Sequence, residues 1–123
     1  MITVCIATYN GSRYIRQQLL SILPQLAETD EIVVSDDGST DDTSEIVRSI
    51  GDKRIRIVDN RKGEGGKNAL SNSLTRNFEN ALRHAKGDYI FLSDQDDVWM
   101  ENKVAVCMEV LRSHHCVVSD AIV

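Results

Sequence analysis

The stretch that decides the fold is Glu31-Ile32-Val33-Val34-Ser35-Asp36-Asp37-Gly38-Ser39-Thr40. Its first half is apolar and rich in β-branched residues, which predicts a buried strand. Its second half consists of Asp, Gly, Ser and Thr, residue types that form turns and cap helices. Asp41 or Asp42 is expected to cap the helix that follows, and Gly51 is expected to end it. The stretch therefore predicts a strand, a polar turn and a helix in immediate succession.

The same succession recurs along the whole chain. Strands are predicted at residues 2–7, 31–35, 54–58, 88–93 and 116–119. Apolar residues at helical spacing predict four intervening helices, the first capped by Ser12 and bent or ended at Pro24. This order predicts an α/β fold with a doubly wound, mostly parallel sheet and helices on both faces. In such sheets ligands bind beyond the carboxyl ends of the strands.

The composition excludes several classes of protein. The chain has 123 residues, with 14 Lys and Arg against 19 Asp and Glu, so its formal net charge is −5. This length allows one compact domain, or part of one, and the acidic balance argues against a nucleic-acid partner. The sequence lacks an apolar run near the roughly 18 residues that span a bilayer, and lacks a signal-peptide pattern. The three cysteines, Cys5, Cys107 and Cys116, lack metal-binding spacing and are predicted to be reduced, mostly buried thiols of a cytoplasmic protein.

Unusual polar clusters follow three of the predicted strands. They occupy residues 7–10, 36–39 and 94–97. Because parallel strands share one carboxyl edge, five aspartates are expected to gather there, and such like charges repel unless a cation or donor groups offset them. Asp94 and Asp96 are two residues apart, so in an extended segment they project to the same side. Hard oxygen ligands of this kind suit Mg²⁺ or Mn²⁺.

Three blocks of sequence resemble family 2 glycosyltransferases, which have the GT-A fold. The blocks are Thr8-Tyr9-Asn10-Gly11, Asp36-Asp37-Gly38-Ser39-Thr40-Asp41, and Gly87-Asp88-Tyr89-Ile90 leading into Asp94-Gln95-Asp96-Asp97-Val98-Trp99. They stand in the family order, and the match runs over essentially the whole chain. The last block, with residues 77–82 upstream, is most similar to bacterial rhamnosyltransferases of cell-surface polysaccharide synthesis. The resemblance implies that residues 1–123 are the Rossmann-like, nucleotide-sugar-binding part of a truncated GT-A domain, without the acceptor-binding part.

The resemblance implies a nucleoside pocket at the ends of the first two strands. Ala7, Thr8 and Tyr9 would line the base pocket, with the Tyr9 ring stacking on a pyrimidine. Asp36 would accept a hydrogen bond from N3–H of the base. Asp37 would support the loop or face the ribose.

The resemblance places the diphosphate and its metal beside the last block. Asp96 would be the main ligand of Mg²⁺ or Mn²⁺, and Asp94 would approach the ribose, the metal or a metal-bound water. Asp97 would be an accessory ligand or would support the others. Lys67 and Arg76 are the candidates for a basic group near the diphosphate, on a stretch that departs from the usual family pattern.

The implied reaction is transfer of a sugar, with inversion, from a UDP- or dTDP-linked donor to a hydroxyl of a saccharide or lipid-linked acceptor. The metal would neutralise charge on the departing diphosphate, and a carboxylate base would deprotonate the acceptor. That base is expected beyond residue 123, so this chain alone is expected to bind nucleotide without completing catalysis. The expected location is the cytoplasm, with peripheral association at the inner face of the membrane.

Two other function classes stay open alongside this one. A non-catalytic nucleotide-binding module would use the same pocket. A phosphoacceptor receiver domain has this length and an aspartate pair at a strand end, but its pair follows the first strand, whereas Asp36 and Asp37 follow the second. The clusters also have structural interpretations: a capped turn at 36–39, a solvated acidic loop at 94–97, and Trp99 as a cover for the core beneath that loop. The segment 63–68 fails P-loop spacing and is interpreted as a surface loop.

Overall fold

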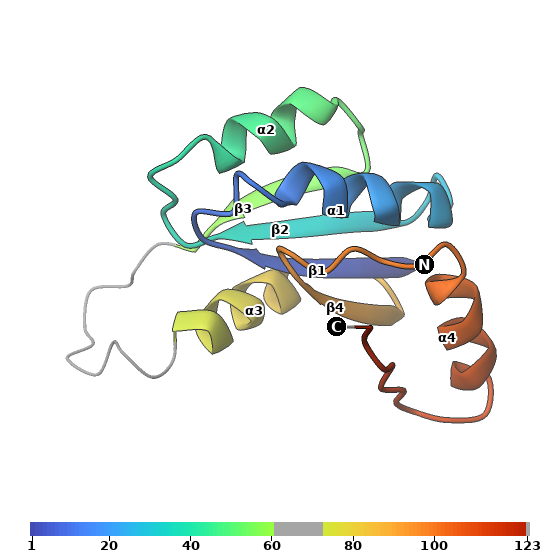
Figure 1. The fold of residues 1–123 in the computed structure, drawn as a ribbon. Coiled ribbons are helices and arrows are strands. Elements are labelled where there is room, and N and C mark those ends of the chain that lie inside the picture. The colour runs from blue at the N-terminus through green and yellow to red at the C-terminus, as the bar shows by residue number, and fades with distance from the viewer. Residues whose placement is uncertain (61–72, 123) are drawn as a thin grey trace.

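The computed structural model describes residues 1–60 and 73–122, in which helices and strands alternate as the sequence predicts (Figure 1). The elements are β1 (Ile2–Thr8), α1 (Ile15–Ile22), the short 3-10 helix η1 (Leu23–Gln25), β2 (Glu31–Asp36), α2 (Thr43–Ile50), β3 (Ile55–Asp59), α3 (Ser73–His84), β4 (Tyr89–Asp94) and α4 (Lys103–Leu111). As predicted, the first α-helix ends near Pro24, where the 3-10 helix η1 replaces it. Proline has no backbone N–H and cannot donate to the α-helical hydrogen bonds. The second predicted stop, Gly51, takes a left-handed backbone conformation directly after α2.

The strands form one parallel sheet in the order β3-β2-β1-β4. The chain moves outward from β1 through β2 to β3, and then places β4 on the other side of β1. The strand order therefore reverses between β1 and β4, and this is the point at which open α/β sheets bind ligands. This arrangement confirms the predicted doubly wound α/β fold.

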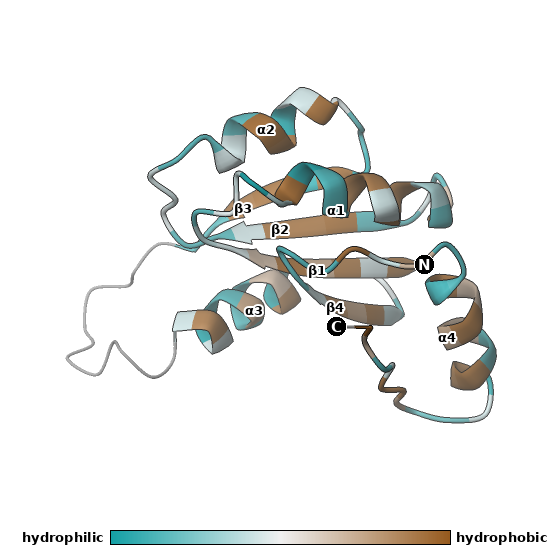
Figure 2. Cartoon of the chain, in the orientation of Figure 1, coloured by the Kyte–Doolittle hydropathy of each residue, from teal (hydrophilic) through white to brown (hydrophobic). Residues whose placement is uncertain are grey.

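Helices cover both faces of the sheet, which explains why β1 and β2 are apolar runs and not alternating ones. Every residue of β1 and of β2 is buried. Helices α1 and α2 cover one face of the sheet and α3 covers the other (Figure 1). Residues of α1, α2 and α4 contribute to the larger core, and α3 packs its Ala81 against Cys5 and Val33. Figure 2 shows hydrophobic residues along the strands and, between hydrophilic ones, on each of the helices. In the described part of the chain, no helix has both the length and the apolar character needed to cross a bilayer.

Two local predictions were wrong. Residues 116–119 do not form a strand, because a strand exists only through hydrogen bonds to a neighbouring strand and the described residues offer this segment none. Ser12 does not cap the first helix, which begins at Ile15 after a turn. The backbone N–H of Ser12 instead donates to Asp41 Oδ2 at 3.1 Å.

The cysteines are unpaired thiols, as predicted, and two of the three are buried. Cys5 and Cys107 lie in the core, whereas Cys116 is exposed. Burial, together with the charge of Glu31, raises the pKa of Cys5 to about 11. Cys5 is therefore a packing residue and not a reactive thiol.

The chain makes a close backbone approach at Gly87, just before β4. A Cβ atom at this position would lie 2.6 Å from Thr3 N and 2.8 Å from Met1 O. These are backbone atoms, and they cannot yield without displacing β1. We expect Gly87→Ala to lower the free energy of unfolding by about 3 kcal/mol, at the upper end of overpacking effects, in a denaturant titration. Lys86→Ala is the matched control, since the backbone N–H of Lys86 keeps its bond to Glu31, and equal stability of the two variants would contradict the steric argument.

Candidate donor-binding site at the carboxyl edge

The sheet register brings the three polar clusters of the sequence to one edge. Thr8 at the end of β1 is paired with Asp36 at the end of β2. On the other side of β1, Ala7 is paired with Asp94 at the end of β4. The segments that follow these three strands therefore leave the sheet at the same level, on both sides of the point where the strand order reverses. This confirms the predicted gathering of the clusters at the carboxyl edge.

Asp36 is the centre of the hydrogen bonds between the first two clusters. Its Oδ1 accepts from the Thr8 hydroxyl at 2.9 Å and from the Ser39 hydroxyl at 2.6 Å. Its Oδ2 accepts the Ser39 backbone N–H at 2.9 Å. The carboxylate is only 7% exposed, so it is fixed in orientation, and Oδ2 retains one acceptor position for a further donor.

Asn10 and Asp37 hold the two loops at either side of this carboxylate. Asn10 has a positive φ of 48°, which asparagine tolerates better than most residues. Its Oδ1 accepts the backbone N–H of Thr40 at 2.8 Å and its own N–H donates to Ser39 Oγ. The Asp37 N–H donates to Thr8 O, and Asp37 Oδ1 accepts from Asn60 Nδ2 at 3.3 Å. Asp37 is thus placed to support the loop, one of the two roles predicted for it.

The third cluster is an exposed acidic loop. The side chains of Asp94, Asp96 and Asp97 all face solvent. Partial burial at the end of β4, and next the charges of Asp97 and Asp96, raise the pKa of Asp94 above its ordinary value. Among the ion pairs formed by residues 1–60 and 73–122, none involves these three carboxylates. Their mutual repulsion would be relieved by a cation.

The donor set of this loop fits Mg²⁺ or Mn²⁺. Over the described ranges, no group of three or more His, Cys, Asp or Glu side chains is arranged to enclose a metal ion. Mg²⁺ commonly uses only one or two protein carboxylates and completes its shell with water and substrate phosphates. Asp96 and Asp94 are exposed carboxylates that meet this requirement.

Helix α1 holds the acidic loop at both of its ends. Gln18 is completely buried, and its amide Nε2 donates to Ser93 Oγ at 2.5 Å and to the backbone oxygen of Asp94. Trp99, which is 5% exposed, donates its ring N–H to the same Ser93 hydroxyl at 3.0 Å and its backbone N–H to Ser21 Oγ at 2.9 Å. The loop from 94 to 98 is therefore anchored at its start and its end. The burial of Trp99 confirms the predicted structural role beneath the loop.

Helix α3 supports the same edge from the other face of the sheet. Asn77 is buried and donates to Thr8 O at 3.0 Å, and Asn80 donates to Ser35 Oγ at 2.8 Å. Arg76 lies next to Asn77 on the exposed side of this helix, whose first turn is at the carboxyl edge (Figure 1). The other predicted basic group, Lys67, lies outside the described residues, as does the segment 63–68.

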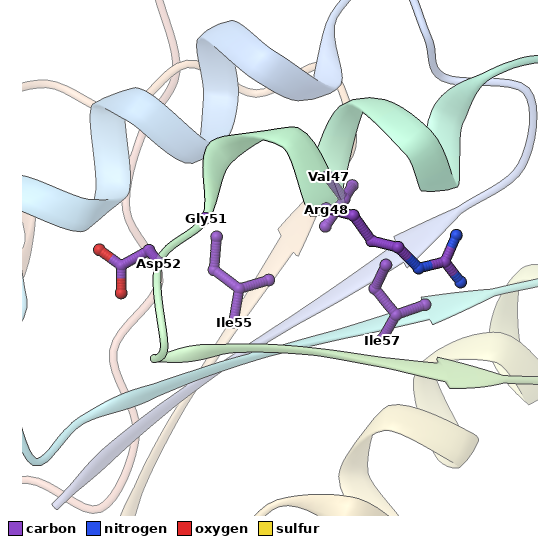
Figure 3. Close-up of a pocket in the computed structure, with 6 residues that line it drawn as sticks. All are labelled: Val47, Arg48, Gly51, Asp52, Ile55 and Ile57. Atoms are coloured by element: carbon purple, nitrogen blue, oxygen red, sulfur yellow. The ribbon is translucent and has the colours of Figure 1, made fainter.

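Two cavities lie away from this edge. One, of about 350 Å³, is bounded by α2 and β3, with Val47, Ile55 and Ile57 among its lining residues (Figure 3). The other, of about 550 Å³, lies between α1 and the start of α4 beside Trp99. Neither cavity is lined by the aspartates of the three clusters, so neither is the candidate donor site.

Sequence reasoning assigned no role to four residues that build the site: Gln18, and Asn77, Asn80 and Gln95, which lie within the motif segments. Each is an amide whose partners lie on distant segments, and the first two are buried in helices. The available signal was a polar residue at a helix position that faces the core, as Gln18 does between Ile15 and Ile22. Buried amides are hydrogen-bonded as a rule, so such a position indicates a polar partner on the facing element.

Known proteins share this fold and sequence. The family model described as glycosyl transferase family 2 matches residues 3–123. The Escherichia coli protein "UDP-Glc:alpha-D-GlcNAc-diphosphoundecaprenol beta-1,3-glucosyltransferase WfaP" is 37% identical, over 85% of this chain and 39% of its own length. The Shigella flexneri "dTDP-rhamnosyl transferase RfbG" is 35% identical, over 94% of this chain and 40% of its own length.

Solved structures agree. The mannosyltransferase PcManGT from Pyrobaculum calidifontis, in complex with GDP-Man and Mn²⁺, superposes with a TM-score of 0.70 and 29% identity, over 89% of this chain and 32% of that one. The fold is therefore that of the GT-A glycosyltransferases, as predicted. The chain spans about 40% of the length of the two curated relatives named above. By the family match over residues 3–123, this chain belongs to glycosyl transferase family 2.

Proposed function

We propose that the protein is a metal-dependent glycosyltransferase, and that residues 1–123 bind its nucleotide-sugar donor. The observation that carries the proposal is the convergence, at one sheet edge, of an oriented carboxylate at Asp36 and an exposed acidic loop at 94–97. A nucleoside diphosphate sugar presents both a neutral base with hydrogen-bond donors and a diphosphate that needs a cation. Asp36 matches the base, and the acidic loop matches the diphosphate with its cation.

The nucleoside is proposed to bind over the ends of β1 and β2. Tyr9 is 54% exposed, so its ring is free to stack on a base. Ala7 and Thr8 form the floor, and Asp36 Oδ2 has the acceptor capacity that an imino N–H of a pyrimidine requires. Asp37 supports this loop or faces the ribose. A uracil or thymine base therefore fits, in a UDP- or dTDP-linked donor.

The diphosphate is proposed to bind beside the acidic loop, with Mg²⁺ or Mn²⁺ held by Asp96 and Asp94. When bound, the metal would stabilise the negative charge that grows on the departing diphosphate. Asp94 and Asp96 would hold the metal at the sheet edge, and Arg76, and Lys67 by its place in the sequence, would add positive charge near the diphosphate. The mannosyltransferase structure with GDP-Man and Mn²⁺ supports a divalent metal in the family.

The acceptor is proposed to be a hydroxyl of a saccharide or of a lipid-linked saccharide, in bacterial cell-surface polysaccharide synthesis and with inversion at the transferred carbon. The name of the WfaP relative includes a diphosphoundecaprenol acceptor, which supports a lipid-linked one. A protein that acts on such an acceptor would work at the cytoplasmic face of the membrane by peripheral association. The general base is proposed to lie on a segment outside residues 1–123, so sugar transfer by this chain alone would contradict that part of the proposal.

Calorimetric titration of this chain with UDP, dTDP, GDP and ADP, each with Mn²⁺ and with EDTA, tests the proposal. We expect UDP and dTDP to bind with Mn²⁺, and to bind at least about tenfold more weakly in EDTA, since loss of the metal leaves the diphosphate facing like charges. Equal binding of all four nucleotides in EDTA would contradict the donor assignment. Failure to bind any of them, with acetyl phosphate labelling an aspartate, would favour the receiver class.

A further inference from the structure

Gln95 joins the two halves of the proposed donor site through its side-chain amide. Its Oε1 accepts the Tyr9 backbone N–H at 3.0 Å, and its Nε2 donates to the Tyr9 backbone O at 3.1 Å. One side-chain amide thus satisfies both the N–H and the C=O of Tyr9. The backbone pairing of β1 with β4 ends at Ala7 and Asp94, so Gln95 links the two chain segments just beyond the sheet through its side chain.

Gly11 leaves the space that this amide occupies. A Cβ atom at residue 11 would lie 2.2 Å from Gln95 Oε1 and 2.7 Å from its Cδ. Both atoms are at the flexible end of a side chain, so a methyl group at 11 would displace the amide without requiring the backbone to move. The backbone of Gly11 is held separately, through its N–H bond to Thr43 Oγ1 at 3.0 Å. Gly11 and Gln95 therefore fit each other and can be tested as a pair.

The position of Gln95 in the chain connects two different functions. It lies between Asp94 and Asp96, the proposed metal ligands, and its amide holds Tyr9, the proposed base-stacking residue. A shift of the acidic loop would therefore move the backbone of Tyr9, and a shift of Tyr9 would move the acidic loop. Both bonds use the neutral amide, so Gln95 contributes no charge to the metal site.

We propose that Gln95 is a positioning residue that couples metal binding at the acidic loop to nucleoside binding at Tyr9. This inference rests on the proposed function. Metal at Asp94 and Asp96 fixes the loop, Gln95 fixes Tyr9 in turn, and the nucleoside then binds a surface that is already ordered. Coupling of this kind between sites changes affinity by about 5- to 150-fold, and it acts equally in both directions.

Three variants isolate the coupling: Gln95→Met, Gly11→Ala and the double variant. Methionine keeps the length of the side chain and removes both hydrogen bonds. Gly11→Ala keeps Gln95 and displaces its amide, so it also serves if Gln95→Met folds poorly. Gln17→Met is the matched control, because Gln17 is exposed on α1.

The readout is the ratio of the UDP dissociation constants in EDTA and in Mn²⁺, measured by calorimetry. We expect each single variant to lower this ratio by about fivefold or more, with little change in the EDTA value, and the double variant to lower it no further. A purely structural role would weaken UDP binding equally in both conditions. An unchanged ratio in Gln95→Met, or strictly additive effects in the double variant, would overturn the inference while leaving the proposed function intact. Failure of the unaltered chain to bind UDP would overturn the proposed function, and this inference with it.

Discussion

Replacing Asp96 with alanine is expected to abolish the Mn²⁺-dependent binding of UDP and dTDP. Asp96 is an exposed carboxylate on a loop anchored at both ends by α1, so its loss removes a ligand without disturbing the core. A residue that merely orients a metal ligand contributes about 10- to 100-fold to metal affinity, so loss of a direct ligand should cost at least about 100-fold. Calorimetry with Mn²⁺ and UDP measures the loss.

Glu101→Ala is the matched control for this variant. Glu101 is also exposed and close in the chain, so the control removes the same charge outside the acidic loop. We expect it to retain UDP affinity within about twofold, because exposed charges are largely screened by solvent and salt. If Asp96→Ala and Glu101→Ala bind UDP equally well in Mn²⁺, the metal assignment is wrong.

Glu31→Ala is expected to destabilise the opposite edge of the sheet. Glu31 is 7% exposed at the start of β2. Its Oε1 accepts from Thr3 Oγ1 at 2.9 Å and from the Lys86 N–H at 2.8 Å, and its Oε2 pairs with Arg56 at 2.9 Å. The Arg56 side chain is 36% exposed, so solvent can replace its partner, whereas the buried Thr3 hydroxyl and the Lys86 N–H lose their acceptor, at a cost of about 2 kcal/mol, measurable in urea. The control is again Glu101→Ala, and equal stability of the two variants would contradict this role.

The contribution of Glu31 should also depend on pH. Burial raises the pKa of this carboxyl, but hydrogen bonds from Lys86, Thr3 and Arg56 and the charge of Arg56 outweigh it, so the net pKa lies below the ordinary 4.5. A lowered pKa in the folded state contributes stability that is fully present above the ordinary value and is lost as the pH falls through the folded one. The difference in unfolding free energy between the unaltered chain and Glu31→Ala should therefore shrink below pH 4.5. A constant difference from pH 7 to pH 3 would contradict the assignment.

Local sequence patterns were sufficient for most of the fold. The runs at 2–7 and 31–35 predicted strands because unbroken β-branched and apolar residues suit a sheet covered on both faces. The same reasoning failed at 116–119, where a similar short run forms no strand. The composition of a segment sets its preference for an extended backbone, but a neighbouring strand has to supply the hydrogen bonds.

The sequence also predicted part of the site, namely which acidic residues gather at the carboxyl edge. Aspartates at and after strand ends predicted that Asp36, Asp94 and Asp96 would meet at one edge, and the register of β1 with β2 and β4 places Asp36 and Asp94 there, with Asp96 two residues further along. The roles of these residues toward base, ribose and metal remain predictions. Sequence patterns did not identify the partners of Gln18 or Gln95, because their amides bond to groups 75 to 86 residues away.

The sequence by itself determined the alternation of strands and helices, the polar turns at the carboxyl ends, and the family. Each of these depends on residues within a few positions of one another, or on motifs in a fixed order. Only the tertiary structure decided which strands are neighbours, and hence that the Tyr9 segment and the acidic loop are joined by Gln95 across the point where the strand order reverses. The physical reason is that an amide side chain carries no preference for one distant backbone group until packing of the sheet brings that group within about 3 Å.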